Sequence, residues 1–239
     1  MFVSDNEDGA SLGPLLALLQ HKVLINTWFG LSDTVLEGGF SFERMHGVNL
    51  FEYHKTDPKL SNVFNKAMIS HTTLVMKNIL DTYKGFEDIK ALVDVGGGLG
   101  INLNMITSKY PTIKGINFDL PHVVQHAPSY EGVDHVGGDM FESVPEGDAI
   151  FMKLLKNCYK STPTKNGKVI VVEAILPVKP DPMHTSVVIS QTDLIMLAQT
   201  TGGKERSQND FQFLATEAGF SGINFLCCAS NFWVMEFYK

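Results

Sequence analysis

Four glycines that directly follow a short apolar segment are the residues best placed to bind a small molecule. Residues 91–95 (ALVDV) have the apolar character of a β-strand, the sequence GGGLG occupies 96–100, and 101–110 has helical spacing. Glycines between a strand and a helix let the backbone turn sharply and approach a ligand, while the first amides of the helix point toward that ligand. A glycine string by itself fits a purely structural loop equally well.

Acidic side chains at the ends of the next two expected strands strengthen the binding interpretation. Asp119 follows 113–118 and stands 19 residues after Gly100, at the spacing where a carboxylate binds ribose hydroxyls. Asp139 and Met140 come after the next strand, where a carboxylate can accept a hydrogen bond from an exocyclic amine and a thioether can pack on an aromatic base. Three successive strand ends therefore predict a nucleoside-binding site.

The charge of the glycine loop indicates which nucleoside. The N-terminus of a helix binds a pyrophosphate best when no carboxylate stands nearby. Asp94, directly before Val95 and the glycines, would repel a pyrophosphate and attract an ammonium group. We therefore expect S-adenosylmethionine, with its ammonium and sulfonium groups, as the cofactor. An NAD(P)-dependent oxidoreductase stays open as an alternative, which stronger binding of nicotinamide than of S-adenosylmethionine would favour.

The spacing of apolar residues changes near residue 88, which predicts two regions. Residues 15–28 and 61–83 have apolar side chains three and four apart, the pattern of amphipathic helices. Between them lie a Gly- and Phe-rich connector at 38–47 and a helix start at 56–58. We expect a helical lobe over 1–87.

After residue 88, short apolar segments alternate with helical ones, and a hairpin ends the pattern. Residues 168–175 are apolar on both faces, which is typical of a parallel strand covered by helices on both sides. The pattern predicts an α/β fold over 88–239, a doubly wound, mostly parallel sheet with an antiparallel C-terminal hairpin. The expected strands are 91–95, 113–118, 133–136, 149–152, 168–175, 223–228 and 232–238, and the expected helices are 101–110, 121–127, 187–199 and 209–218.

Composition excludes several classes of protein. The 239 residues include 19 Lys and Arg against 26 Asp and Glu, a formal net charge of -7, which argues against a nucleic-acid binder. No apolar run reaches the ~20 residues that span a bilayer, and acidic residues near the start argue against a signal peptide. We therefore expect a cytoplasmic protein that does not bind membranes. Cys227 and Cys228 have no second cysteine pair, so we expect two strand residues on opposite faces, no metal and no disulfide framework.

Four segments together make the chain similar to a known enzyme family. VDVGGG at 93–98, GINFDLP at 115–121, VGGDMF at 136–141 and GGKER at 202–206 resemble motifs of the plant caffeic acid O-methyltransferase family. The resemblance covers nearly the whole chain and implies the Rossmann-like fold of S-adenosylmethionine methyltransferases. It implies methylation of a phenolic hydroxyl on a caffeate-like phenylpropanoid or a related aromatic. The lobe over 1–87 would then be the remnant of a dimerisation and substrate region, and 88–239 the methyltransferase domain.

The resemblance also implies roles for individual residues. The family's cofactor contacts correspond to Gly96, Asp119, Asp139, Met140 and Lys153, and the charge and turn of the glycine loop predict two more, Asp94 and Gly98. The lining of the family's phenolic pocket corresponds to His54, Phe64, Met68, His71, Ile195 and Met196. The two carboxylates that flank the family's catalytic histidine correspond to Glu173 and Glu205.

The chain departs from the family where that catalytic histidine is expected. Family members continue their Phe-Met-Lys strand with a Trp-x-x-His-Asp-Trp segment, whereas here Lys153 is followed directly by LLKNC. A phenol has a pKa of about 10, so methyl transfer at neutral pH needs a base, and no histidine lies between His135 and His184. We expect impaired catalysis. The alternative is a non-catalytic remnant that binds S-adenosylmethionine or a phenol and pairs with a full-length relative.

Two structural consequences are expected from these departures. Residues 154–165 must return from the fourth strand to the fifth, close to the minimum for a parallel crossover, so we expect a short or distorted helix and a more open cofactor pocket. The family begins with a longer dimerisation region than the part present here. We therefore expect a weakened homodimer, with partial exposure of Leu15, Leu16, Leu19 and Trp28.

Overall fold

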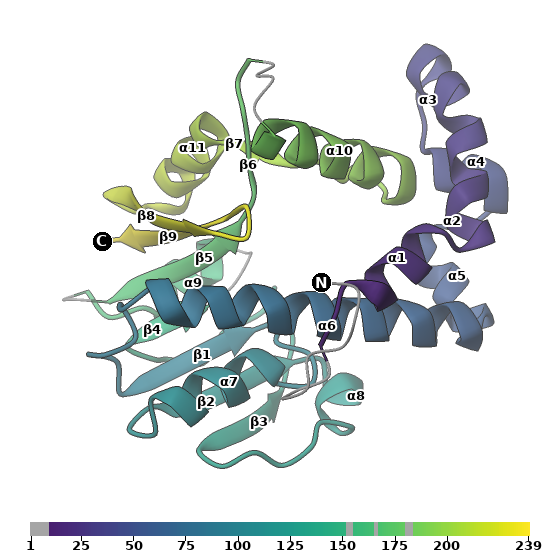
Figure 1. Cartoon of the computed structure of the whole chain (residues 1–239). Helices are drawn as coiled ribbons and strands as arrows, with labels where there is room; N and C mark the ends of the chain where they lie inside the picture. Colours follow the sequence, from purple (N-terminus) through teal and green to yellow (C-terminus); the bar gives the residue numbers. More distant parts are fainter. Residues whose placement is uncertain (1–9, 152–154, 165–166, 180–183) are drawn as a thin grey trace. The chain divides into compact units, whose positions relative to one another are not determined.

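Two units make up the fold, and each combines stretches that are far apart in the sequence (Figure 1). The computed structural model describes residues 10–151, 155–164, 167–179 and 184–239. One unit, which we call the helical unit, comprises Met1–Leu74 and Ile175–Ser207; the other, the sheet unit, comprises Val75–Ala174 and Gln208–Lys239. The division at residues 87 and 88 stays a prediction, because contacts rather than function define these units.

The helical unit consists mainly of short helices. Its elements are α1 (Gly13–Leu19), α2 (Lys22–Thr27), η1 (Trp28–Gly30), α3 (Leu31–Glu37), α4 (Ser41–His46), α5 (Leu50–Thr56), most of α6 (Pro58–Thr82), β6 (Ile175–Leu176), α10 (His184–Gln199) and β7 (Arg206–Ser207). Its buried core includes Leu18, Leu24, Phe42, Leu50 and Leu60. The apolar faces predicted from helical spacing therefore pack together within this unit.

Two expectations for the first helices are wrong in detail. The single amphipathic helix expected over 15–28 is divided into α1 and α2, because His21 between them has an extended backbone with φ −65° and ψ 132°. The connector expected at 38–47 contains α4, since Gly38 ends α3 with φ 80° and Gly47 ends α4 with φ 78°. Glycine at these helix ends avoids the strain that a side chain would meet at positive φ.

The long helix α6 begins where the sequence predicts. Asp57 precedes Pro58, the first residue of α6, and its Oδ1 accepts hydrogen bonds of 3.0 Å from the backbone amides of Lys59 and Leu60. A carboxylate at this position satisfies amides that have no partner within the helix and complements the positive end of the helix dipole.

A seven-stranded sheet forms the centre of the sheet unit. Its strand order is β3-β2-β1-β4-β5-β9-β8, with β1 to β5 parallel and β9 antiparallel to both of its neighbours. This order confirms the mostly parallel sheet with an antiparallel C-terminal hairpin. The strands are β1 (Ala91–Val95), β2 (Lys114–Asp119), β3 (Val133–Gly137), β4 (Ala149–Phe151), β5 (Lys168–Glu173), β8 (Gly222–Ala229) and β9 (Phe232–Tyr238).

The fifth strand is shorter than the range 168–175 expected from the sequence. β5 ends at Glu173, and the chain passes into the helical unit after Ala174. Ile175 then pairs with Arg206 in the separate β6–β7 ladder. Its apolar side chain is therefore used in a second ladder rather than in the main sheet.

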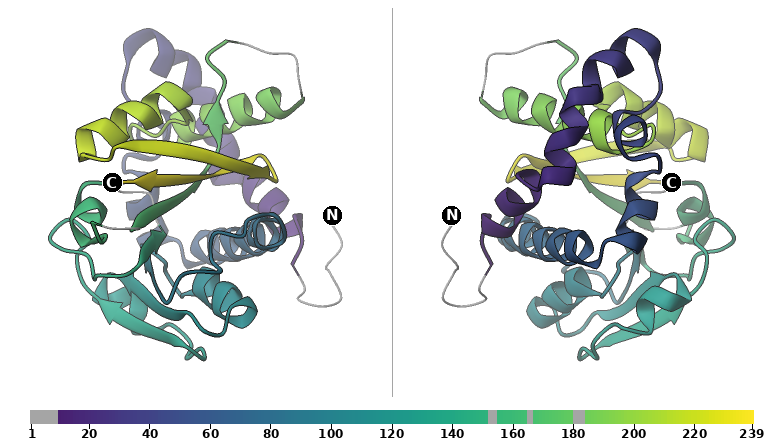
Figure 2. Two further views of the ribbon diagram at one scale, coloured as in Figure 1. Left: turned by 90° about the vertical axis from the view of Figure 1, so that its left-hand side faces the viewer. Right: turned by 90° about the vertical axis from the view of Figure 1, so that its right-hand side faces the viewer.

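Helices cover both faces of the sheet (Figure 2). The C-terminal part of α6 and α7 (Ile101–Lys109) lie on one face, and α9 (Leu155–Ser161) and α11 (Gln208–Ala218) lie on the other. A short helix, α8 (Pro121–Val124), follows β2. α9 contains seven residues, below the ~11–12 of an average helix, so the short helix expected after the fourth strand is confirmed.

A mostly buried charge pair joins the end of α6 to the sheet. Lys168 Nζ lies 2.6 Å from Glu236 Oε1 and donates a hydrogen bond of 2.8 Å to the carbonyl oxygen of Gly85. The Tyr83 hydroxyl, just beyond α6, donates to the same glutamate. Burial and this carboxylate raise the pKa of Tyr83, so the hydroxyl stays protonated and able to donate.

The sheet topology predicts where a ligand can bind. From β1 the chain builds the sheet outward through β2 and β3, and it then returns to β4 on the other side of β1. In such sheets the helix connections diverge at this switch point and leave a crevice at the carboxyl ends of the strands. The glycine loop at 96–100 follows β1 and therefore stands at this crevice.

Candidate functional site

The glycine loop makes a tight turn held to the neighbouring strand. The backbone amide of Gly96 donates a hydrogen bond of 2.8 Å to the carbonyl oxygen of Phe118 in β2. Gly96, Gly98 and Gly100 have φ of 74°, 60° and 80°, which L side chains rarely adopt. The sequence places glycine where the backbone requires it, and α7 begins directly after Gly100.

The glycines of the loop present two different faces. A Cβ atom at Gly97 would lie 2.2 Å from Asn117 Oδ1, and one at Gly100 would lie 3.0 Å from His135 Cε1, so these glycines sit against the protein. At Gly98 no atom would lie within 4 Å of a Cβ, and at Gly96 the nearest would be the Met140 Cε atom at 4.0 Å. The open side of the loop at Gly96 and Gly98 can therefore receive a ligand at close range.

Asp119, the carboxylate expected to bind ribose, is hydrogen-bonded directly to the loop. Its Oδ2 accepts a hydrogen bond of 2.9 Å from the Gly98 amide, and its Oδ1 accepts one of 2.7 Å from the Leu120 amide. Each carboxylate oxygen has two lone pairs, so both can still accept from hydroxyl groups. The two bonds fix the direction in which those remaining lone pairs point.

Met140 lies close to the same loop, and Asp139 precedes it in the chain. The Met140 methyl group approaches Gly96, and Asn157 donates hydrogen bonds of 2.7 and 2.9 Å to the carbonyl oxygens of Met140 and Phe141. Asp139 Oδ1 accepts a hydrogen bond of 2.8 Å from the Phe141 amide, which leaves the second carboxylate oxygen of Asp139 for another donor. A soft thioether next to the loop gives a flat aromatic base a surface to pack on.

Asp94 is a carboxyl group poised to ionise near neutral pH. It is 3% exposed, and burial raises its pKa to about 7; a 3.4 Å hydrogen bond from Asn102 Nδ2 lowers the pKa, while the nearby charge of Asp119 raises it. A bound cation would favour the ionised form. This chemistry suits the ammonium group that the sequence analysis expected here.

Sequence reasoning missed Asn117 and His135, which also touch the loop. Asn117 Nδ2 donates a hydrogen bond of 2.9 Å to the Gly98 carbonyl oxygen and lies 3.0 Å from His135 Nδ1. Each is a polar residue inside a predicted strand, as Asp94 is, but this pattern alone assigns it no role. Only the pairing of β1, β2 and β3 makes the three residues neighbours.

The remaining expected site residues of the sheet unit are only partly placed. Lys153 lies outside the described residues. Glu173 is the last residue of β5 in the sheet unit and is half-buried. Glu205 belongs to the helical unit, and its backbone amide donates a hydrogen bond of 2.7 Å to Asp193 Oδ1. The catalytic role of these glutamates stays a prediction.

No described histidine of the sheet unit has the form of a free general base at the loop. The three histidines of this unit are His122, His126 and His135. His122 and His126 lie in and just after α8, and both ring nitrogens of His135 have hydrogen-bond partners, Asn117 and the Pro128 carbonyl oxygen. A base needs a free lone pair directed at the proton that it removes.

All six residues expected to line the phenolic pocket belong to the helical unit. The ring of His54 lies 4.7 Å from that of Phe64, measured between centroids, and Phe64 and Met68 pack against the core of this unit. His54 Nε2 is buried without a hydrogen-bond partner among the described residues, and burial lowers the pKa of this imidazole. His71 lies on α6, and Ile195 and Met196 lie on α10.

A separate pocket opens in the helical unit. It measures about 530 Å³ and is lined by Glu43, Asn49, Leu50, Phe51, Glu52, Lys55, Thr200 and Thr201. None of the six expected pocket residues belongs to this set. Among the described residues, no helix is long and apolar enough to cross a membrane, and no three His, Cys, Asp or Glu side chains are grouped to hold a metal ion.

Comparisons with known proteins connect this site to one kind of enzyme. A profile of the O-methyltransferase domain matches residues 28–221. Catechol O-methyltransferase 1 of Solanum lycopersicum is 68% identical over 260 aligned positions, which cover 100% of this chain and 69% of that protein. Caffeic acid 3-O-methyltransferase 1 of Ocimum basilicum is 53% identical over 251 positions, with coverage of 100% and 69%.

A solved structure and the length of one alignment add to these comparisons. The solved structure of LaPhzM shares 28% identity and a TM-score of 0.81 with this chain, over 96% of this chain and 73% of that one. The alignment with the Solanum lycopersicum protein has 260 positions for a chain of 239 residues, so at least 21 positions have no counterpart here.

Proposed function

Since this chain belongs to the O-methyltransferase family, we propose that its sheet unit binds S-adenosylmethionine at the glycine loop and that its acceptor is a phenol. When bound, this cofactor supplies an electrophilic methyl group on a sulfonium. Asp94 would hold the ammonium group, Asp119 the ribose hydroxyls, Asp139 the exocyclic amine and Met140 the adenine face, as the sequence analysis expected. Gly96 and Gly98 would allow the backbone to approach, and Lys153 is a further expected contact.

The single observation that carries this proposal is the bond between Asp119 and the Gly98 amide. In this hydrogen bond the Gly98 amide nitrogen, in the loop after β1, lies 2.9 Å from Asp119 Oδ2 at the end of β2. The arrangement offers two lone pairs to neighbouring hydroxyls and leaves the Gly98 face free. A buried Asp94 with a pKa of about 7 adds a partner for a cation rather than for a pyrophosphate.

We assign acceptor binding to the predicted lobe over 1–87 together with α10. His54, Phe64, Met68 and His71 supply aromatic, thioether and imidazole groups, which suit a phenol ring with polar substituents. Ile195 and Met196 would complete the pocket. The names of the relatives point to catechol and caffeic acid as the acceptors to try first.

We further propose that this chain transfers methyl groups poorly. Bound S-adenosylmethionine would supply the methyl group for the phenol oxygen, and a residue of this chain would have to accept the phenol proton. Glu173 and Glu205 are poor bases for a group of pKa about 10, because a carboxylate ordinarily has a pKa near 4. The Solanum lycopersicum alignment is at least 21 positions longer than this chain, which agrees with the missing segment that the resemblance places after Lys153.

Asp119→Asn tests the cofactor site. The amide keeps the size of the side chain but removes the charge that strengthens hydrogen bonds to ribose, so the Kd for S-adenosylhomocysteine is expected to rise about 10- to 100-fold. Isothermal titration calorimetry measures this change. Asp134→Asn is the matched control, since Asp134 is an exposed carboxylate of β3 paired with Lys114 at 3.2 Å. Equal affinities for the two variants would contradict the assignment of Asp119.

A second candidate is a non-catalytic binding protein that pairs with a full-length relative. The absence of a free general base among the described histidines of the sheet unit favours it. S-adenosylmethionine binding without turnover on any catechol, together with capture by a full-length relative, would select this function.

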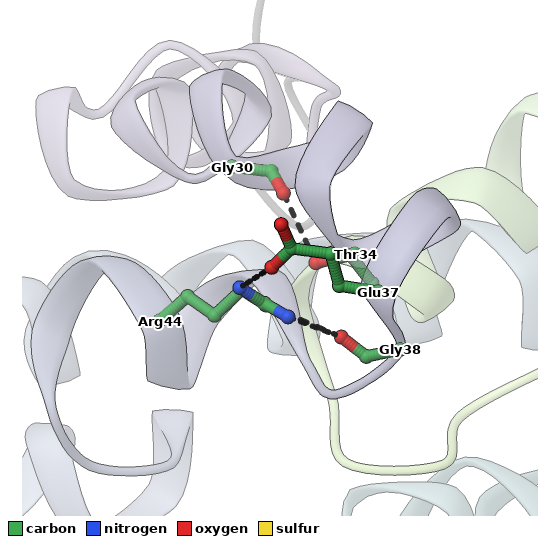
Figure 3. Close-up of polar contacts among 5 residues, drawn as sticks. All are labelled: Gly30, Thr34, Glu37, Gly38 and Arg44. Carbon is green, nitrogen blue, oxygen red and sulfur yellow. Dashed lines mark hydrogen bonds and ion pairs between the residues drawn. The ribbon is translucent and has the colours of Figure 1, made fainter.

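We also propose a homodimer formed through the helical unit and a cytoplasmic location. Phe29, Val35 and Leu36 are 76%, 69% and 80% exposed. Figure 3 shows the hairpin that presents α3: Arg44 binds the Gly38 carbonyl oxygen at 2.7 Å and pairs with Glu37 at 3.1 Å. Leu16, Leu19 and Trp28 are exposed as predicted, and Leu15 is half-buried.

Leu36→Glu is expected to convert the dimer to a monomer. A buried charge at an apolar contact is costly, whereas the same change on a free surface costs little. Sedimentation velocity measures the mass of the particle. The control is Ser32→Glu, which introduces the same charge on the same helix. Glu37→Lys is not a suitable control, because it breaks the ion pair with Arg44. A monomeric wild-type chain at high micromolar concentration would refute the dimer.

A further inference from the structure

Three polar residues form a row across the sheet under the glycine loop. Asp94 pairs with Asn117, and Asn117 pairs with His135, in the parallel registers of β1, β2 and β3. Residues paired in this way point to the same face of a sheet. All three side chains lie against the glycines of the loop. A Cβ atom added at Gly97 would lie 2.7 Å from Asp94 Oδ2 and 2.2 Å from Asn117 Oδ1. A Cβ atom added at Gly100 would lie 3.0 Å from His135 Cε1. The glycine loop therefore packs on this row of side chains.

Hydrogen bonds fix the orientation of the row. His135 Nε2 lies 2.9 Å from the Pro128 carbonyl oxygen, which can only accept, so Nε2 carries the proton. Neutral His135 then accepts at Nδ1 from Asn117 Nδ2, 3.0 Å away. The second hydrogen of the same amide nitrogen goes to the Gly98 carbonyl oxygen at 2.9 Å. A neutral imidazole thus holds Asn117 with its donor turned toward the loop.

We propose that Asn117 and His135 are positioning residues that hold Gly98 for S-adenosylmethionine, and that protonation of His135 releases Gly98 and weakens cofactor binding. This inference rests on the proposed function and adds a regulation of the same site. Neither residue needs to touch the cofactor. They act through Gly98, whose amide is bonded to the ribose-binding Asp119.

The physical step is a rotation of the Asn117 amide. An imidazolium carries hydrogens on both nitrogens, so Nδ1 would face the Asn117 amino group as a second donor. The amide must turn and present Oδ1 to the ring, which removes the donor from the Gly98 carbonyl oxygen. Oδ1 is buried and has no partner among the described residues, so the turned amide gains one. Losing one net hydrogen bond to the loop corresponds to about a fivefold change in affinity.

Several titratable or charged groups stand on the elements around the His135 ring. Asp94 stands on β1 at the far end of the row, and Asp119 stands two positions beyond Asn117 on β2. Tyr130, from the loop before β3, places its ring 6.1 Å from that of His135. Asp134 points to the opposite face, where it pairs with Lys114 at 3.2 Å. The test therefore spans pH 5.5 to 8.0, the range over which histidine side chains in general can change charge.

The test compares the Kd for S-adenosylhomocysteine at pH 8.0 and pH 5.5 by calorimetry. His135→Asn keeps an acceptor near Asn117 but cannot be protonated. The ratio of the two Kd values is expected to be about fivefold larger for the wild type than for this variant. Any contribution of Asp94 is present in both proteins and cancels in the comparison. His122→Gln, at an exposed position of α8, is the matched control and keeps the wild-type ratio.

Asn117→Ala separates positioning from folding. It is expected to weaken binding at pH 8.0 about fivefold and to give the pH ratio of His135→Asn, while the circular dichroism spectrum is unchanged. Weaker binding with the wild-type pH ratio would show a merely structural role and overturn the proposal, as would equal ratios in the wild type and His135→Asn.

A tautomer measurement tests the row without any cofactor. Long-range ¹H–¹⁵N spectra are expected to show His135 at pH 8.0 with its proton on Nε2. A proton on Nδ1 would overturn the proposal even if the cofactor binds. Conversely, the Nε2–H form together with no S-adenosylhomocysteine binding at either pH would refute the proposed cofactor and the coupling to it, but would leave the row itself correct.

Discussion

Insertion after Lys153 of the Trp-x-x-His-Asp-Trp segment that the family resemblance predicts there is expected to raise methyl transfer to catechol by about 10²–10⁴-fold. This is the range that a positioned general base contributes. We expect the phenol proton to lack a suitable acceptor among the described residues of the sheet unit, because both ring nitrogens of His135 have hydrogen-bond partners and the predicted carboxylates are weak bases. Formation of S-adenosylhomocysteine from S-adenosylmethionine and catechol measures the rate.

The decisive control is the same insertion with its histidine replaced by glutamine. This control repairs the length of the crossover before β5 but supplies no base, so it is expected to bind the cofactor as tightly as the active insertion and to turn over slowly. If it is as active as the histidine-containing insertion, the missing length rather than the missing base limits the rate. If the unaltered chain already turns over as fast as the Solanum lycopersicum enzyme, impaired catalysis is wrong.

Asp94→Asn is expected to stabilise the cofactor-free protein at pH 8 and to weaken cofactor binding. The pKa of Asp94 is raised by burial from 3.8 to about 7, so the folded state holds a proton that the unfolded state loses from about pH 4 upward. The free energy of unfolding of the wild type therefore falls by roughly 4 kcal/mol as pH rises from 4 to 7, and it stays at the lower value above pH 7. The variant has no such loss, and its amide can donate to the buried Asn117 Oδ1.

Chemical denaturation at pH 4.5 and pH 8 measures this linkage, with the difference between variant and wild type growing with pH. The binding arm uses two ligands. S-adenosylhomocysteine, which carries the ammonium group, is expected to lose about tenfold in affinity for the variant, whereas methylthioadenosine, which lacks it, is expected to bind both proteins equally. A pH-independent stability difference would contradict the raised pKa, and equal losses for both ligands would contradict the ammonium contact.

Much of the sheet unit could be read from short apolar segments. The strand over 91–95 and the hairpin strand over 232–238 are confirmed at both ends. Errors occur where local pattern and tertiary pairing disagree: Ile175 continues an apolar segment yet pairs with Arg206, and the helical spacing of 15–28 continues through the break at His21. Periodicity reports which residues are apolar, not which partner buries them.

The candidate site divides in the same way. The places of Asp119, Asp139 and Met140 at or after the ends of strands could be predicted, because parallel strands end at one edge of a sheet and position along the chain is enough. Asn117 and His135 could not, because a polar residue inside a strand gains a role only from the residues paired beside it. The same holds for the pKa of Asp94, which depends on burial and on the charge of Asp119.

By itself, the sequence determined the fold class, the glycine loop and the carboxylates at the strand ends, since these follow from local composition and order along the chain. The tertiary structure alone decided which faces of the glycines are open, which oxygen of Asp119 holds the loop, and that Asp94, Asn117 and His135 form one row. Hydrogen bonds and electrostatic shifts act over a few ångströms in space, and distance along the chain does not encode that proximity.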